Sequence, residues 1–215
     1  MEVDRSHQPD DMGMPPPLDA TLLVLAGGAS RRMGRPKALL PVGEETLIEH
    51  VLRQLEPAFA EVLVSANDPE LVPEAVRRRH RLVADLHRGA GPLAGIEAGL
   101  AAAAYEVVFV AACDMPHVSP DSARRITRAA AGHDAAVPRS GERAEPAYAA
   151  YRQSAAGAVA AAIAGGELMV RSLLEELDVA WIDDLDPRLF RNLNTPDDYR
   201  ELLAALHQSF RLKVE

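Results

Sequence analysis

Short apolar runs rich in β-branched residues alternate with longer amphipathic runs through most of this chain. Some of the longer runs carry apolar residues at helical spacing, as Leu93, Ile96 and Leu100 do. The alternation is typical of βαβ units wound on a parallel sheet. We therefore predict an α/β fold with a doubly wound, mostly parallel sheet flanked by helices. The predicted strands are residues 21–25, 61–65, 81–84, 107–112, 135–138, 147–151 and 179–182.

The length of 215 residues and the 48% hydrophobic content suit one compact domain, and two full domains would be cramped. Residues 1–20 are acidic, contain the run Pro15-Pro16-Pro17, and have no apolar core of signal-peptide length. We predict that residues 1–20 form a disordered extension and that residues 21–215 form a single domain.

The formal net charge of −9 argues against a general nucleic-acid binder, which needs a basic surface. No stretch is long and apolar enough to span a bilayer. The single cysteine, Cys113, excludes an internal disulfide and a cysteine-cluster metal site, and it is better interpreted as a small buried hydrophobe than as a nucleophile. These features predict a cytoplasmic protein that binds neither nucleic acid nor membrane.

The segment from Leu25 to Lys37 follows the first predicted strand and holds three glycines and four cationic side chains. Glycines allow tight bends with bare N–H groups, and cations beside them favour a polyphosphate. The segment lacks both Gly-x-x-x-x-Gly-Lys-Ser/Thr and Gly-x-Gly-x-x-Gly, which disfavours a kinase-type loop and a dinucleotide fold. A mobile surface loop with solvated arginines would have the same composition, so composition alone leaves that interpretation open.

Two more polar segments follow predicted strands. Asp114 ends the apolar run from Val107, where a carboxylate can hold a hard cation beside phosphates, although a simple turn aspartate would fit the same place. Residues 85–95 join a strand to a helix that opens at Pro92, and Gly91 and Gly95 leave room for a base or ribose, or merely for close helix packing. Because ligands bind at the carboxyl ends of strands in such sheets, we expect these segments to converge on one site.

Taken in order, these segments resemble the molybdenum cofactor guanylyltransferase family, within the nucleotidyltransferases of Rossmann-like fold and nucleotide-diphospho-sugar transferase type. The likeness covers about residues 20–205. It is carried by Leu25-Ala26-Gly27-Gly28-x-Ser30-x-Arg32-Met33-Gly34, Lys37, Gly91-Pro92-Leu93-Ala94-Gly95-Ile96, Cys113-Asp114-Met115-Pro116 and Asn192-x-Asn194-Thr195-Pro196.

The resemblance implies transfer of GMP from GTP to the phosphate of Mo-molybdopterin, with release of pyrophosphate. It implies Mg²⁺ on Asp114, an acceptor placed near Asn192 and Asn194, and transient contacts with proteins that deliver or receive molybdopterin. The implied nucleotide-binding residues are Leu25, Ala26, Gly27, Gly28, Lys37, Asn67, Asp85, Gly91, Gly95 and Asp114.

The chemistry of in-line transfer requires groups that hold two polyanions together and stabilise charge on the leaving oxygens. We therefore predict that Arg32 and Lys37 clamp the triphosphate and that Mg²⁺ on Asp114 acts as template and Lewis acid. These three residues are the predicted catalytic set.

The nucleotide stays open between GTP and CTP. Pro36 stands before Lys37, where many relatives have an acidic residue, and the same form occurs in cytidylyltransferases that act on the same pterin. The Gly27-Gly28 pair favours guanine. A sugar-phosphate nucleotidyltransferase also fits these motifs and, from a different class of protein, so does a non-catalytic nucleotide-binding adaptor.

Overall fold

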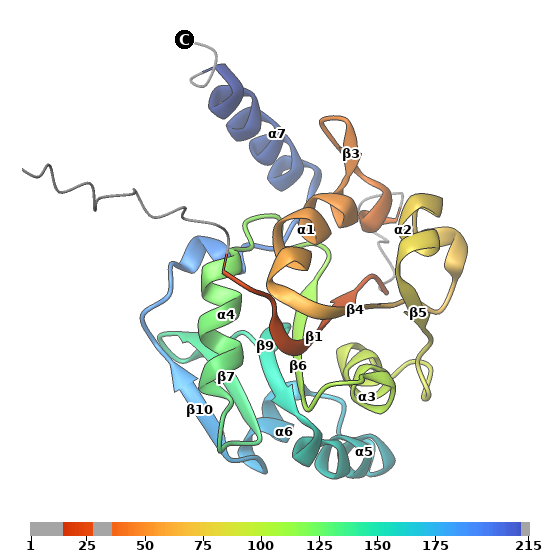
Figure 1. Cartoon of the computed structure of the whole chain (residues 1–215), viewed down its shortest axis with the longest axis vertical. Helices are drawn as coiled ribbons and strands as arrows, with labels where there is room; N and C mark the ends of the chain where they lie inside the picture. Colours follow the sequence, from red (N-terminus) through yellow and green to blue (C-terminus); the bar gives the residue numbers. More distant parts are fainter. Residues whose placement is uncertain (1–14, 28–35, 212–215) are drawn as a thin grey trace, which may run out of the picture.

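The computed structural model describes residues 15–27 and 36–211 (Figure 1). An eight-stranded sheet forms its centre, in the order β10-β7-β9-β6-β1-β4-β5 with β8 paired to β7. The parallel pairs are β1 with β4 and with β6, β4 with β5, and β7 with β10, whereas β9 runs antiparallel to both its neighbours. The bounds are β1 Leu18–Leu25, β4 Phe59–Ser65, β5 Arg81–Val83, β6 Val107–Ala112, β7 Ala135–Ser140, β8 Arg143–Ala144, β9 Tyr148–Arg152 and β10 Val179–Ile182.

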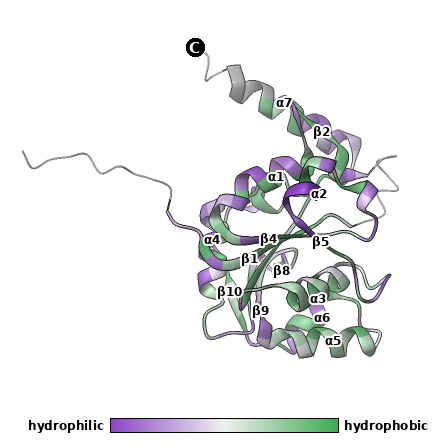
Figure 2. Ribbon diagram, turned by 45° about the vertical axis from the view of Figure 1, so that its right-hand side comes forward, coloured by the Kyte–Doolittle hydropathy of each residue, from purple (hydrophilic) through white to green (hydrophobic). Residues whose placement is uncertain are grey.

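Helices cover both faces of this sheet (Figure 2). Helices α1 (Leu47–Leu55), α2 (Glu74–Arg79) and α4 (Pro120–Ala129) lie on one face, and α3 (Pro92–Ala102), α5 (Ala156–Ala164) and α6 (Val170–Glu175) lie on the other. In β1, Leu22 and Val24 pack toward the first layer while Leu23 and Leu25 pack toward the second. Burial on both faces explains why the strands are continuous apolar runs, and the predicted doubly wound α/β fold is confirmed.

A short hairpin and the last helix form a third, smaller core. The hairpin of β2 (Pro41–Val42) and β3 (Glu45–Thr46) follows a 3₁₀ turn, Lys37–Leu39, and packs against α7 (Pro196–Arg211). Thr195 caps α7, since its Oγ1 accepts from the Asp198 N–H at 3.2 Å while the Asp198 carboxylate accepts from the Thr195 N–H at 2.8 Å. Leu193 and Leu202 are buried in this core, so the segment just before α7 is fixed in place.

The predicted disordered extension is wrong for residues 15–20. Strand β1 begins at Leu18, and Arg124, which is only 5% exposed, donates to the carbonyls of Pro15 (2.9 Å), Pro16 (2.7 Å) and Pro57 (3.4 Å). A buried guanidinium needs hydrogen-bond acceptors, and the three proline carbonyls supply them. Residues 1–14 lie outside the described part of the chain.

Deleting residues 1–17 is therefore expected to lower the melting temperature, because Arg124 loses two of these acceptors. A loss of about 1–3 kcal/mol corresponds to about 2–12 °C for a chain of this size. The matched control deletes residues 1–14 and leaves all three carbonyls in place. Equal melting temperatures for the two deletions in differential scanning fluorimetry would show that the contacts of Arg124 do not stabilise the fold.

Within the ranges that the structure describes, no helix has the length and apolar character needed to cross a membrane.

Candidate functional site

The carboxyl ends of four neighbouring strands, β6, β1, β4 and β5, are held in register just beyond the sheet. Three backbone hydrogen bonds continue the ladder: Cys113 N–H to Leu25 C=O (3.0 Å), Ala26 N–H to Ser65 C=O (2.9 Å) and Ala66 N–H to Val83 C=O (2.9 Å). The chain winds from β1 through β4 to β5 and then returns to the other side of β1 at β6. This reversal of strand order is where ligands bind in open α/β sheets.

Lys37, Asp114 and Asn194 meet at this edge, although they are far apart in sequence; we call them the lysine cluster. Lys37 Nζ donates to Asp114 Oδ2 at 2.6 Å and to Asn194 Oδ1 at 3.1 Å. The side chains of Lys37 and Asp114 are about one-fifth exposed, so a ligand can reach them. A cation and a carboxylate are thus both presented at the end of the sheet.

Backbone contacts fix the members of the lysine cluster. Lys37 starts the 3₁₀ turn, which is closed by the Leu40 N–H donating to the Lys37 carbonyl at 3.0 Å. Asp114 follows β6, and its carbonyl accepts from the Leu193 N–H at 2.9 Å. Because Leu193 is buried against α7, its neighbour Asn194 is held beside Lys37.

Ser65, Asn67 and Asp85 form a second group, the amide cluster, at the ends of β4 and β5. Asn67 and Asp85 bond reciprocally: Asn67 Nδ2 donates to Asp85 Oδ2 at 2.6 Å, and the Asp85 N–H donates to Asn67 Oδ1 at 2.9 Å. Ser65 Oγ donates to Asp85 Oδ1 at 3.4 Å. The cluster offers polar side chains on the opposite side of β1 from Asp114.

Two glycines are required where α3 begins. Gly91, the residue before α3, has φ +60° and ψ −144°, a backbone conformation that L side chains rarely adopt. A Cβ on Gly95 would lie 2.7 Å from Leu25 Cδ2 and 2.9 Å from Ser65 Oγ. Gly95 therefore lets the first turn of α3 lie against the ends of β1 and β4.

The structure brings most of the predicted site residues to one edge. Leu25 and Ala26 are almost buried at the end of β1, and Gly27 is exposed. Gly28 and Arg32 lie outside the described residues, so their predicted roles remain predictions. Asn192 does not join the lysine cluster, but it lines a cavity that adjoins it.

This cavity, of about 280 Å³, connects the lysine cluster to the far half of the sheet. Asn194 lines it and also accepts from Lys37, so the cavity opens beside the lysine cluster. It is lined by Ser140, Arg143, Glu145, Pro187, Phe190, Arg191, Asn192 and Asn194. The mixture of cationic, acidic and amide side chains with one aromatic ring suits a polar heterocycle that carries an anionic group.

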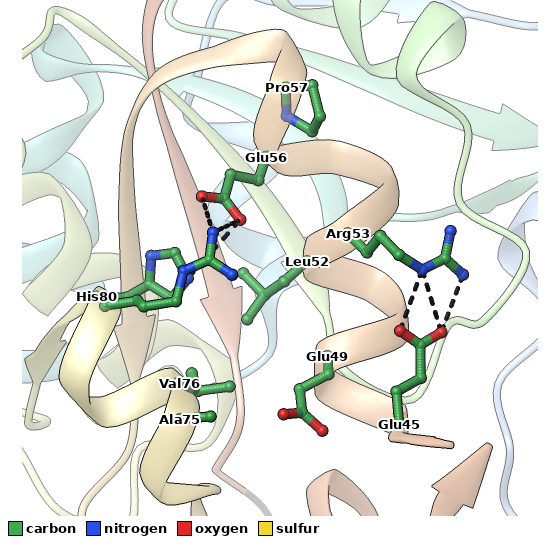
Figure 3. A pocket seen from close by; sticks show the side chains of 10 residues that line it. Glu45, Glu49, Leu52, Arg53, Glu56, Pro57, Ala75, Val76 and His80 are labelled. Atoms are coloured by element: carbon green, nitrogen blue, oxygen red, sulfur yellow. Dashed lines mark hydrogen bonds and ion pairs between the residues drawn. The ribbon is translucent and has the colours of Figure 1, made fainter. Parts of the chain in front are cut away.

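A larger cavity, of about 540 Å³, lies between α1 and α2 and shares no residue with either cluster (Figure 3). It contains two ion pairs, in which Arg53 donates to Glu45 Oε2 at 3.0 Å and Arg79 donates to Glu56 at 3.1 Å, and the Glu49 carboxylate accepts from the Thr46 N–H at 2.8 Å. Leu52 and Val76 form its apolar floor. Both arginines of this cavity are therefore paired with glutamates of the protein.

The donor chemistry at Asp114 fits a hard divalent cation. No group of three or more His, Cys, Asp or Glu side chains able to hold a metal occurs among residues 15–27 and 36–211. Mg²⁺ is commonly bound by one or two carboxylates, with substrate phosphates and water as the other ligands. One carboxylate beside a phosphate site is compatible with that mode.

Burial raises the pKa of the Cys113 thiol to about 12, and the Asp114 carboxylate adds to the shift. The thiol is 6% exposed, which agrees with the predicted small buried hydrophobe and not with a nucleophile.

Cys113 is therefore expected to be unreactive toward a chromogenic disulfide reagent in the native protein up to pH 9, and to react fully after unfolding. Its raised pKa contributes stability below the unfolded thiol pKa of 9.0, and that contribution decreases as the pH rises above it. Fast native labelling of one thiol per chain would contradict the burial.

Sequence reasoning missed Ser65 as a site residue, whereas Glu145 belongs to Glu145-Pro146-Ala147-Tyr148, an acceptor-side segment that matches the family only loosely. Ser65 is a polar residue at the end of a buried strand, the same signal that identified Asp114. Glu145, an acid only 5% exposed, stands before β9, and the structure places it at the wall of the cavity that Asn192 and Asn194 also line.

Most of the sheet and its helices match a known protein family. The family model of the MobA-like NTP transferase domain matches residues 22–181. The chain belongs to this family. It is therefore an enzyme of the nucleotidyltransferase class, as the motifs predicted.

Named relatives agree with the assignment. The chain is 38% identical over 188 residues, 84% of this chain and 90% of the relative, to a probable molybdenum cofactor guanylyltransferase of Pelotomaculum thermopropionicum. It is 32% identical, over 83% of this chain and 88% of the relative, to the molybdenum cofactor guanylyltransferase of Syntrophotalea carbinolica. Among solved structures, molybdopterin-guanine dinucleotide biosynthesis protein A from Archaeoglobus fulgidus has a TM-score of 0.76 at 31% identity, covering 87% of this chain and 99% of that protein.

Proposed function

We propose that this protein transfers GMP from GTP to the terminal phosphate of Mo-molybdopterin and releases pyrophosphate. Family membership and the names of relatives at 32–38% identity support this activity. The proposal is carried by the two hydrogen bonds that Lys37 donates, one to Asp114 and one to Asn194. They join the predicted nucleotide side of the site to the predicted acceptor side.

The amide cluster binds the base and ribose of the nucleotide, and the lysine cluster binds its triphosphate. A Cβ on Gly91 would meet no atom within 4 Å, so Gly91 leaves space for the base and ribose, whereas Gly95 serves the packing of α3 against Leu25 and Ser65. Asn67 and Asp85 supply donors and acceptors for the nucleoside. The triphosphate then extends across the end of β1 toward Lys37, with Gly28 and Arg32 as its predicted partners. This direction follows from the order of β5, β4, β1 and β6 in the sheet.

In the reaction, an oxygen of the acceptor phosphate forms a bond to the α-phosphorus of GTP. The bond from that phosphorus to the bridging oxygen breaks, and pyrophosphate leaves with the electron pair. A phosphate monoester is already anionic near neutral pH, so no protein base is needed. The protein holds the two anions in line, and the Lys37 ammonium offsets the charge that develops on the phosphate oxygens.

Asp114 is the carboxylate that would hold Mg²⁺. When bound, that ion supplies charge neutralisation and orientation for the phosphates. Asn192 and Asn194 hold the acceptor in the adjoining cavity.

Pyrophosphate release with GTP and CTP in parallel, each with Mo-molybdopterin as acceptor, tests the proposal. We expect release with GTP to exceed release with CTP by at least about tenfold. Polar groups of the base pocket that form hydrogen bonds with guanine would be left unpaired when cytosine is bound. A preference for CTP, or release only with a sugar phosphate, would assign the chain to a different transferase. Binding of GTP without release for any acceptor would indicate an adaptor.

A further inference from the structure

The cavity beside the lysine cluster contains one deeply buried carboxylate, that of Glu145. Its backbone is fixed from both sides, because its N–H donates to the Pro138 carbonyl at 2.8 Å and its carbonyl accepts from the Tyr148 N–H at 3.0 Å. Arg143 Nε lies 3.0 Å from Glu145 Oε1, but the Arg143 side chain is 72% exposed. The acid is thus held rigidly at the cavity wall, while its cationic partner is on a solvent-exposed side chain.

This position is unfavourable for a carboxylate that serves only the fold. Burial raises the pKa of Glu145, and Arg143 opposes the shift only in part. Because the Arg143 side chain is 72% exposed, its ion pair with the buried Glu145 offsets the desolvation of that carboxylate only in part. An acid in such surroundings at the wall of a cavity is typical of a binding group.

The other side chains at the cavity show what kind of ligand is complementary to it. Asn192 Oδ1 is buried without a hydrogen-bond partner among the described residues, so this wall holds a second oxygen acceptor in need of a donor. Arg143 and Arg191 line the same cavity, Arg143 paired with Glu145 and Arg191 with Glu201 at 2.9 Å. A complementary ligand therefore presents N–H donors to these two oxygen acceptors.

We infer that Glu145 is the specificity-determining residue for the acceptor, and that its carboxylate accepts hydrogen bonds from the ring N–H and the 2-amino group of a 2-amino-4-oxopyrimidine. This edge belongs to a pterin, and the inference rests on the proposed function. Two parallel N–H donors match the two oxygens of a carboxylate.

Guanine carries the same edge, but the position of the cavity favours the pterin. The cavity is lined from β7, β8 and the segment before α7, on the β6 side of β1. The amide cluster lies on the other side, at the ends of β4 and β5. When a nucleoside occupies the amide cluster, the cavity is available for the acceptor. Lys37 and Asn194, which are hydrogen-bonded to each other, then lie between the nucleoside and the acceptor.

The test uses two stable probes that differ only in this edge. 6-Hydroxymethylpterin carries the 2-amino group, and 6-hydroxymethyllumazine carries a 2-oxo group in its place. Binding of each is measured by fluorescence quenching in the wild-type chain, in Glu145→Gln, and in the control Glu142→Gln, which makes the same change at an exposed neighbour outside this cavity. GTP affinity and melting temperature are measured for all three proteins.

The wild-type chain and Glu142→Gln are expected to bind the pterin at least about tenfold more tightly than the lumazine, and Glu145→Gln is expected to lose that preference. The GTP affinity of Glu145→Gln is expected to equal that of the wild type. Its melting temperature is expected not to fall, since the substitution removes a carboxylate whose desolvation is unfavourable. Three outcomes would overturn the inference: equal pterin affinity in wild type and Glu145→Gln, loss of GTP affinity in place of pterin affinity, or no wild-type preference between the probes. None of these outcomes depends on turnover, so a failure of the proposed transfer activity is detected separately.

Discussion

Asp114→Ala is expected to lower pyrophosphate release from GTP by at least about 100-fold, the size of effect seen when a charged group at a transition state is removed. Asp114 holds Lys37 at 2.6 Å and is the carboxylate placed to bind the divalent cation. Because its side chain is one-fifth exposed, its removal is expected to alter the fold only slightly. The loss should therefore appear in kcat.

Asp121→Ala is the matched control for Asp114→Ala. Asp121 is an exposed carboxylate in the first turn of α4, so its loss affects only a helix end. Pyrophosphate release should stay within about twofold of wild type for this variant, as is usual for surface changes outside a site. Near-normal turnover in Asp114→Ala would exclude Asp114 from the reaction.

Lys37→Ala is expected to raise the KM for GTP and to lower kcat, each by about 10-fold or more, because the ammonium loses contact with both ground-state and transition-state phosphate charge. Lys37 also joins Asp114 to Asn194, so its removal separates the nucleotide side of the site from the acceptor side. Steady-state kinetics with varied GTP at saturating acceptor measure the two effects separately.

Arg78→Ala provides the comparison for Lys37→Ala. Arg78 is an exposed cation on α2 that pairs with Glu74 and belongs to neither cluster. If removing this surface charge lowered turnover as much as removing Lys37, the effect would come from the overall charge of an acidic protein and not from the site.

The strands could be predicted because burial on both sheet faces leaves a direct signal. Residues 107–112 and 21–25 are apolar at nearly every position, since each side chain packs against a helical layer. The β2–β3 hairpin was missed because strands of two residues carry no periodicity. The start of β1 was missed because Leu18 and Asp19 follow three prolines, and only pairing with β4 makes them a strand.

The site could be predicted in part for a similar reason. Asp114 and Asp85 follow parallel strands of one sheet, so their placement at the same edge of that sheet follows from topology. The contact of Asn194 with Lys37 could not be derived from spacing, because it depends on Leu193 being fixed between β6 and α7. The Glu145 cavity depends likewise on elements that meet only in the folded chain.

Transfer of GMP to the acceptor is tested most directly by following isotopic label from GTP. GTP labelled at the α-phosphorus should pass its label to the pterin product, with one label transferred per pyrophosphate released. GTP labelled at the γ-phosphorus should give all of its label to pyrophosphate. Asp114→Ala should transfer neither label. Appearance of the γ-label on the acceptor would mean kinase chemistry and would contradict the nucleotidyl-transfer function of this site.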